Sequence, residues 1–286
     1  MRRLVWLACF IFTTCLGRAA LNVTLKDGDS FVAESMVPQG TKFQVSVAGQ
    51  KPRVIEAAAI ERVDMSEPAN YAEMTNSYLA GDTVKMLQAM GKLRAELEPY
   101  KSVPGARDWW LDVEFLRGHI LLHQKRFKEV EASMKEIAAD DRDPEAKRHA
   151  QAFLAHMTGI NGDPRKAVEE LRAHIVATTD PDTLADAWLF AGHHYGTLGD
   201  QQSALLAYLR VPVFYPGRAI ALAGARLGAA RSFVALEDPA RARASLKELI
   251  AKVPNTAEAA EGKRLLAQVE RDLGLAAPEE PSKEKK

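Results

Sequence analysis

The stretch Ala185–Pro216, ADAWLFAGHHYGTLGDQQSALLAYLRVPVFYP, predicts two helices joined by a tight turn. Gly199-Asp200 interrupts the apolar pattern, because a glycine suits the end of the first helix and an aspartate can cap the start of the second. Pro216 stops the second helix. Gly192 and Ala204 are small residues at the points where the two helices would come closest. We therefore expect a helical hairpin whose close contact depends on these small residues.

The same arrangement repeats along the chain with a nearly constant period. Units that begin at Leu111, Arg148, Ala185 and Ala223 are separated by 37, 37 and 38 residues. The position of closest approach in the first helix is small in all four units, and its residues are Gly118, Ala155, Gly192 and Ala230. A weaker unit begins at Glu67. Stacked hairpins bury one continuous core, so the sequence predicts a mainly α fold, a solenoid of about five helical hairpins.

The residues after the last unit predict one further helix. Thr256–Leu273 has the apolar spacing of an amphipathic helix. Its expected buried set is Ala257, Ala260, Leu265, Leu266, Val269 and Leu273. Such a helix can cover the open end of the array, as a stack of repeats requires. The predicted array then covers residues 67–273.

Residues 20–64 have a different pattern and predict a small strand-rich module. Apolar and polar side chains alternate in residues 21–25, 30–37 and 42–47, with turn residues between these runs, and further short apolar runs lie in residues 54–63. Four or five short strands predict a bent antiparallel sheet or barrel, similar in pattern to SH3-like or Sm-like folds. A module this small is marginal alone, so we expect it to pack on the first helices and cap the array. The alternative is a second binding surface.

The two ends of the chain predict segments outside the folded array. The charged start Met1–Arg3, the apolar run Leu4–Leu16 and the small residues after it are typical of a secretory signal, so we expect residues 1–19 to be removed. The run is shorter than the ~20 residues of a bilayer-spanning helix, which disfavours a retained anchor. Cys15 lacks the preceding pattern of a bacterial lipobox. Residues 274–286 predict a disordered, charged tail, with a docking tail as the alternative.

Composition argues against several classes of function. The 38 basic residues balance 38 acidic ones, so no global positive field attracts a nucleic-acid backbone. Both cysteines, Cys9 and Cys15, lie in the predicted signal, so the mature chain is expected to have no disulfide and no cysteine-bound metal or cluster. No long apolar run follows the signal, so we expect no integral membrane segment after its cleavage.

Seven residues of the clearest unit match a known repeat pattern. They fall at positions 4, 8, 11, 15, 20, 24 and 32 of the tetratricopeptide repeat and are Trp188, Gly192, Tyr195, Gly199, Ala204, Tyr208 and Pro216. With the export signal and the long period, the chain resembles bacterial envelope proteins of the tetratricopeptide type, such as outer-membrane assembly lipoproteins and the periplasmic coordinators of the Tol system. The resemblance covers roughly Glu67 to Leu273. It implies a periplasmic scaffold that binds envelope proteins and has no catalytic residues.

In such a superhelix, positions 2, 5, 9 and 12 of each first helix face the concave surface. The candidate groove residues are Tyr71, Asp112, Phe115, His119, Leu122, His149, His156, Asp186, Leu189, His193, Leu227 and Arg231. Three consecutive units place a histidine, His119, His156 and His193, at the same position. This mixture of apolar anchors and polar groups can accept a peptide. We therefore expect a non-catalytic scaffold that binds a protein or peptide in this groove; the alternative is a structural component of an envelope complex that uses its outer faces and its strand-rich module.

Metal binding and catalysis are disfavoured by spacing. Stacked helices lie about 8–10 Å apart, whereas zinc ligands converge to about 2.1 Å from one ion. His119 and His123 could share a metal, but no third ligand is placed by the sequence. Asp140–Asp143 is interpreted as a turn that caps the next helix and not as a calcium loop. We expect no cofactor, no metal and no enzyme activity, while a pH-dependent role for the histidine column stays open.

Overall fold

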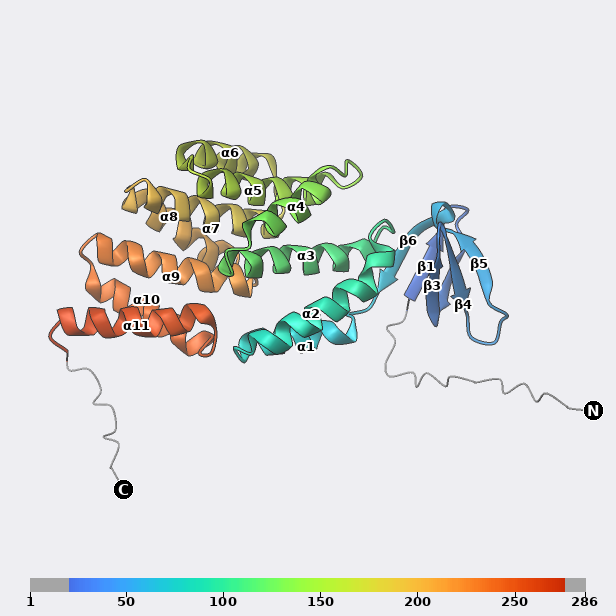
Figure 1. Ribbon diagram of the computed structural model, residues 1–286, viewed down its shortest axis with the longest axis horizontal. Helices are drawn as coiled ribbons and strands as arrows, with labels where there is room; N and C mark the ends of the chain where they lie inside the picture. The colour runs from blue at the N-terminus through green and yellow to red at the C-terminus, as the bar shows by residue number, and fades with distance from the viewer. Residues whose placement is uncertain (1–20, 276–286) are drawn as a thin grey trace, which may run out of the picture. The chain divides into compact units, whose positions relative to one another are not determined.

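A computed structural model describes residues 21–275, and within them the chain forms two compact units. The first unit comprises residues 21–73 and 91–110, and the second comprises residues 74–90 and 111–275. Figure 1 shows the strands in the first unit and the stacked helices in the second. The division therefore runs through the first, weakest predicted hairpin. The predicted signal segment, like all but two residues of the predicted tail, lies outside the described residues.

The first unit contains two small antiparallel sheets. Its strands are β1 (Leu21–Leu25), β2 (Ser30–Ala33), β3 (Ser35–Gln39), β4 (Lys42–Ser46), β5 (Arg53–Glu56) and β6 (Ile60–Met65). One sheet has the order β2-β1-β6 and the other the order β3-β4-β5. The predicted alternation is confirmed, since Val23, Phe43 and Val45 all lie in the core. The pairing of β1 with β6 brings the two ends of the module together.

The stretch of residues 30–37, predicted as one strand, is two strands. Glu34 lies between them, where the chain leaves the sheet of β1 and enters the sheet of β4. Its N–H donates to the Ser46 carbonyl at 2.8 Å. Ala33 and Met36 are both buried although they are three residues apart, so the inward-facing phase shifts at the break. An alternation pattern read as continuous hides this change of sheet.

Residues 98–106 complete the core of the first unit. Tyr100, Val103 and Ala106 are buried with the inward-facing strand residues. The Tyr100 hydroxyl donates to the Met36 carbonyl at 2.6 Å, and its ring stacks on Phe43 with centroids 5.7 Å apart. Apolar residues outside the sheets thus supply part of a core that a module of this size needs.

The helical part of the chain is built from consecutive antiparallel hairpins. Its helices are α1 (Ala69–Leu79), α2 (Thr83–Leu97), α3 (Ala106–His123), α4 (Phe127–Ala138), α5 (Pro144–Ile160), α6 (Pro164–Ala177), α7 (Pro181–Thr197), α8 (Gln201–Phe214), α9 (Ala219–Ala235), α10 (Pro239–Lys252) and α11 (Ala257–Asp272). Helices α5, α7 and α9 begin at residues 144, 181 and 219, which confirms the predicted period. They lie side by side (Figure 1). The predicted solenoid-like array is therefore present.

Local signals start and stop these helices as expected. Within residues 21–275, six helix starts have an aspartate whose side chain accepts a backbone N–H of the first turn, and these are Asp82, Asp143, Asp163, Asp180, Asp200 and Asp238. Gly199, between α7 and α8, has a φ of +81° that only glycine adopts freely. The run Asp140–Asp143 is a turn that caps α5, as predicted.

The small residues are packing points. A Cβ on Gly118 would lie 2.9 Å from the Phe153 ring, and one on Gly192 would lie 2.7 Å from the Tyr208 ring. Ala204 is fully buried at the facing position of the second helix. Larger side chains at these points would push the helices apart.

Helix α11 is present, but its buried face differs from the predicted one. Of the predicted set, Val269 is buried and Leu265 and Leu266 are half-buried, whereas Ala257, Ala260 and Leu273 are exposed. The buried residues are Glu258, Ala259, Gly262 and Val269. Glu258 turns inward because its carboxylate binds His123 of α3 at 2.9 Å. The predicted apolar stripe took no account of a buried ion pair at the start of this helix.

Within residues 21–275, no helix combines the length and apolar character needed to cross a bilayer.

Candidate functional site

Six of the twelve candidate groove residues lie in the interior of the second unit. Each of these residues is less than one tenth exposed, and the six are Phe115, His119, His149, His156, Asp186 and Leu227. Tyr71 in the first unit is half-buried, as are Asp112, Leu122 and Leu189 in the second, while His193 and Arg231 are exposed. Five of the six lie on α3, α5 and α7 and pack close to one another, whereas Leu227 lies on α9 in a separate apolar cluster. The use of these residues in partner binding stays a prediction.

Two histidines clamp one buried carboxylate. His149 Nε2 lies 2.8 Å from Asp186 Oδ2, and His119 Nε2 lies 3.0 Å from Asp186 Oδ1. Burial acts to raise the pKa of Asp186, but the contacts with both imidazoles outweigh it and hold the pKa well below its usual range. Asp186 is therefore a buried anion that ties α3, α5 and α7 together.

A second histidine pair lies next to this clamp. His156 Nδ1 and His194 Nε2 are 2.9 Å apart, and the His156 ring stacks on Phe190 with centroids 4.1 Å apart. Burial, followed by the neighbouring histidines, holds the pKa of His156 well below its usual range. Burial and His193 lower the pKa of His194 to about 4. Both rings are neutral at pH 7. We call His119, His149, His156, His194 and Asp186 the histidine core.

The histidine core is packed among aromatic rings. Phe115 stacks on His149 with centroids 3.8 Å apart. Phe153 contacts His119, His149 and Phe190, with centroid distances between 4.9 and 5.7 Å. The polar atoms of the core are thus bonded to one another inside an apolar surround, where such bonds are strong and an unpaired charge is costly.

His194 was not among the predicted groove residues. The repeat pattern assigned its neighbour His193 to the concave surface, but the side chain of His194 is the one that points inward. His194 is only 1% exposed. Its ring lies against Gly159 of α5, where a Cβ would be 2.2 Å from Cε1 of the ring. Gly159 lies at position 12 of the unit that begins at Arg148, and its missing side chain leaves a space on α5 that a ring from the next hairpin fills.

The edge of the core is more exposed and includes His193 and Arg231. His193 lies with its ring centroid 5.4 Å from that of His156, and burial and Arg231 lower its pKa. Arg231 of α9 pairs with Glu261 of α11. Within residues 21–275, no group of three or more His, Cys, Asp or Glu side chains is arranged to hold a metal ion.

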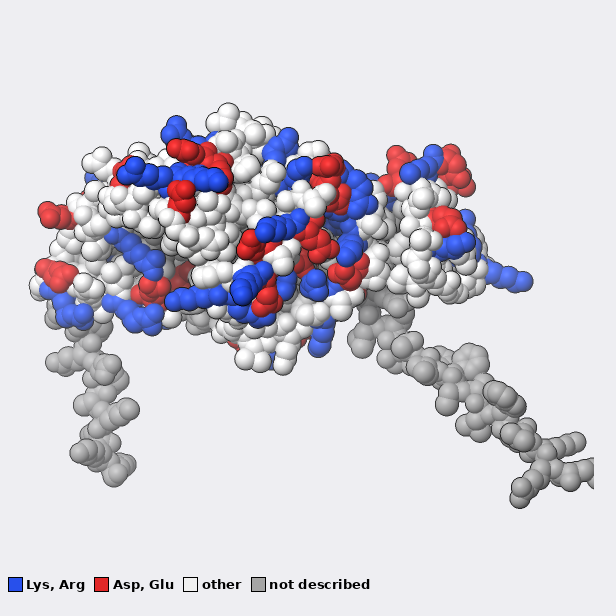
Figure 2. Space-filling model, turned by 45° about the horizontal axis from the view of Figure 1, so that its top comes forward, with Lys and Arg blue, Asp and Glu red and all other residues white. Residues whose placement is uncertain are grey.

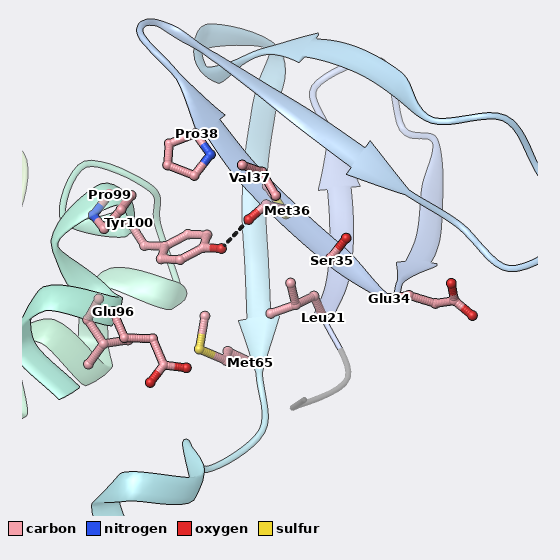
Figure 3. Close-up of a pocket in the computed structure, with 11 residues that line it drawn as sticks. Leu21, Glu34, Ser35, Met36, Val37, Pro38, Met65, Glu96, Pro99 and Tyr100 are labelled. Atoms are coloured by element: carbon pink, nitrogen blue, oxygen red, sulfur yellow. Dashed lines mark hydrogen bonds between the residues drawn. The ribbon is translucent and has the colours of Figure 1, made fainter. Parts of the chain in front are cut away.

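The first unit has a cavity of about 250 Å³ that the sequence did not indicate. Its lining is mainly apolar and comprises Leu21, Glu34, Ser35, Met36, Val37, Pro38, Met65, Glu96, Leu97, Pro99 and Tyr100. Figure 3 shows the Tyr100 ring among these side chains, with its hydroxyl bonded to the Met36 carbonyl. Pro38 has no N–H to donate from the edge strand β3, which hinders pairing with another strand there.

The outer surface of the second unit carries apolar side chains on α8. Leu206, Val213 and Phe214 are 64%, 66% and 63% exposed. Leu206 and Val213 are seven residues apart and lie on one face of the helix, with Phe214 beside them. Elsewhere, Figure 2 shows Lys and Arg side chains interspersed with Asp and Glu on the face it draws. The α8 strip is therefore a candidate contact surface for another protein.

No protein-family model and no curated protein sequence matches the chain. Among solved structures, the chain is similar to the crystal structure of BtubC (BKLC) from P. vanneervenii, with 14% sequence identity and a TM-score of 0.42. That similarity covers 73% of this chain and 85% of the other. A TM-score this low does not establish a shared fold. The fold and the site define only a class, a helical hairpin array with a small antiparallel β module.

Proposed function

We propose that this protein is an exported, non-catalytic scaffold of the tetratricopeptide type in the bacterial cell envelope, and that it binds a protein or peptide. The close packing at Gly118 and Gly192 supports the repeat assignment, because the tetratricopeptide pattern needs small residues at those positions. The charge and apolar pattern of residues 1–20 supports export to the periplasm.

The α8 strip is the observation that carries the binding proposal. Its inward face is buried through Ala204, Ala207, Tyr208 and Val211. Its outward face leaves Leu206, Val213 and Phe214 more than 60% exposed. Covering large apolar side chains that stand in water is favourable by roughly 25 cal/mol per Å², and exposed groups of them mark protein contacts. A protein partner that packs on α8 gains this free energy.

Fewer residues of the predicted groove are accessible to a partner than the repeat pattern suggested. With six of its twelve residues in the interior, the accessible residues of the second unit are Asp112, Leu122, Leu189, His193 and Arg231. A peptide could still bind along this edge by polar contacts. The outer α8 strip and the inner edge are therefore two separable candidate surfaces for the same function.

The test begins with chemical cross-linking in the native envelope and identification of the captured protein by mass spectrometry. The purified partner is then titrated by calorimetry with the wild type and two paired variants, Val213→Ser with Phe214→Ser, and His193→Ala with Arg231→Ala. We expect the α8 pair to weaken binding at least tenfold. Val176→Ser on α6, where the side chain is 87% exposed, is the matched control and should bind normally.

The outcomes separate the two surfaces. A loss of affinity that is confined to the His193 and Arg231 variant would move the partner to the inner edge. Unaltered binding by both paired variants would contradict a scaffold role for either surface.

The cavity of the first unit favours one second candidate, a structural component of an envelope complex that docks through its β module. Val37 lines the cavity and is 45% exposed. In that role Val37→Asp should release the protein from the complex in a native gel, while the α8 variants should leave assembly intact. The reverse pattern would contradict this role.

A further inference from the structure

The bond between His156 and His194 exists only while one of the two rings is neutral. One of the two nitrogens, 2.9 Å apart, donates a proton, and the other accepts it through its lone pair. A proton added to each ring would leave two cationic rings whose N–H groups face each other. Acid therefore replaces an attraction between α5 and α7 with a repulsion.

The groups that face this pair cannot compensate for an added charge. Helix α3 contributes His119, and α7 contributes His193 and Asp186. Asp186 is the carboxylate that favours a charged His156, but both of its oxygens are already engaged, by His119 and His149. The remaining neighbours are other histidines, whose own protonation would add positive charge.

The exposed edge adds a further cation. Arg231 of α9 acts on His193 and on Tyr208 of α8. Its guanidinium also pairs with Glu261 of α11. A protonated His193 would therefore meet positive charge from α9 as well.

The His156 and His194 rings also have no room to separate while the helices stay packed. His156 stacks on Phe190. His194 is held against Gly159, where even a methyl group would be too large. Relief from the repulsion thus requires movement of α5 relative to α7 and not a change of rotamer.

We propose that the histidine core is a proton-binding site that locks α5 onto α7 at neutral pH and releases them in mildly acidic solution. Release would uncover the candidate groove residues that are buried around the histidine core in the locked state, namely Phe115, His119, His149, His156 and Asp186. The separation of α5 from α7 is proposed for this chain alone. Any effect of that separation on partner binding rests on the proposed function.

The direction of the effect follows from His194. Its pKa is lowered from 6.5 to about 4 in the folded chain. A histidine with a depressed folded pKa stabilises the locked state fully above pH 6.5, and this contribution is lost as the pH falls toward 4. At pH 5, these two pKa values raise the open population about 30-fold from His194 alone.

Hydrogen exchange with mass spectrometry on the full chain tests the opening. Exchange rates at pH 7.5 and 5.0 are corrected for the intrinsic pH dependence of amide exchange. We expect protection of α5 and α7 amides to fall about 30-fold at pH 5.0, with strands β1–β6 as an internal reference. Equal protection of α5 and α7 at the two pH values would overturn the proposal.

Variants assign the response to the core. His194→Gln and His156→Gln each remove a titrating ring and should abolish most of the pH response. The matched control is His174→Gln on α6, because burial lowers the pKa of His174 outside the core, and this variant should keep the response. Should one core variant fail to fold at pH 7.5 by circular dichroism, the other serves in its place, and the wild-type comparison stands. A full response in a folded core variant, or its loss in His174→Gln, overturns the assignment. Partner binding is not measured, so the result is independent of the proposed function.

Discussion

The substitution Gly159→Ala tests the packing of the histidine core most directly. The new Cβ would lie 2.2, 2.5 and 2.7 Å from Cε1, Nδ1 and Nε2 of the His194 ring. Contacts this short cannot exist, so the ring must shift by about 1 Å and give up its bond to His156. Overpacking costs about 1–3 kcal/mol and the lost hydrogen bond about 0.5–1.5 kcal/mol, while alanine in a helix returns about 0.5–1 kcal/mol. We expect a net loss of about 0.5–4 kcal/mol in the free energy of unfolding.

The assay is urea unfolding at pH 7.5, followed by far-ultraviolet circular dichroism. Gly196→Ala on α7 is the matched control, because its Cβ would meet only the Ala204 Cβ at 3.9 Å. That variant should gain about 0.5–1 kcal/mol from the helix preference of alanine. If Gly159→Ala proves as stable as Gly196→Ala, then His194 does not lie against α5 and the description of the core is wrong.

Three other substitutions probe contacts outside the histidine core. Gly81→Ala should lower the free energy of unfolding of the second unit by more than about 2 kcal/mol, because the new Cβ would lie 2.1 Å from the Asn255 carbonyl oxygen just before α11. The control is Gly162→Ala, which also has a positive φ, of +115°, but has open space around the new Cβ. In thermal unfolding this control should cost only about 1 kcal/mol. Tyr100→Phe removes a buried hydrogen bond to β3 and should cost the first unit about 1–2 kcal/mol in urea unfolding, so an unchanged midpoint would contradict that bond. For Glu258→Gln, the effect should be largest between about pH 4.5 and 6.5: although burial acts to raise the pKa of Glu258, its hydrogen bond with His123 lowers it, and the same bond raises the pKa of His123. The Glu258 carboxylate stabilises the fold above its unfolded pKa, and the charged His123 stabilises it below the unfolded pKa of histidine. An equal loss of stability in Glu258→Gln at pH 5.5 and 8.5 would therefore refute the pairing.

Much of the helical fold could be predicted because its signals are local. The turn at Gly199 and the cap at Asp200 depend on the backbone conformation of a few neighbouring residues. Small residues recur at the position of Gly192 with a fixed spacing, because every hairpin repeats the same close contact between its two helices. Such features need no knowledge of distant parts of the chain.

In the strand-rich unit, the alternation of inward and outward side chains could be predicted, but the division of the strands between two sheets could not. Side chains point inward or outward according to the pleat, which the sequence records. The change of sheet at Glu34 depends on which strand lies beside each segment, and that is a non-local choice. The packing of Tyr100 against Met36 and Phe43 joins residues separated by more than 50 positions.

The candidate site shows the same limit in its chemistry. The frame correctly brought His119, His156 and Asp186 to facing helices, but it treated each as a lone side chain on an open surface. The structure places His119 in contact with Asp186, and His156 in contact with His194 and Phe190. His194 joins them although it lies one residue from the predicted position, since the vacancy at Gly159 accepts its ring.

The sequence by itself determined the period, the turns, the caps and the small residues of a helical hairpin array, because these follow from the local conformation of each repeat. Only the tertiary structure decided what the inward side chains do. Hydrogen bonds between His156 and His194, and between Asp186 and its two histidines, depend on distances between residues that lie 37 or more positions apart in the chain. Those distances turn a predicted polar groove into a buried, acid-sensitive core.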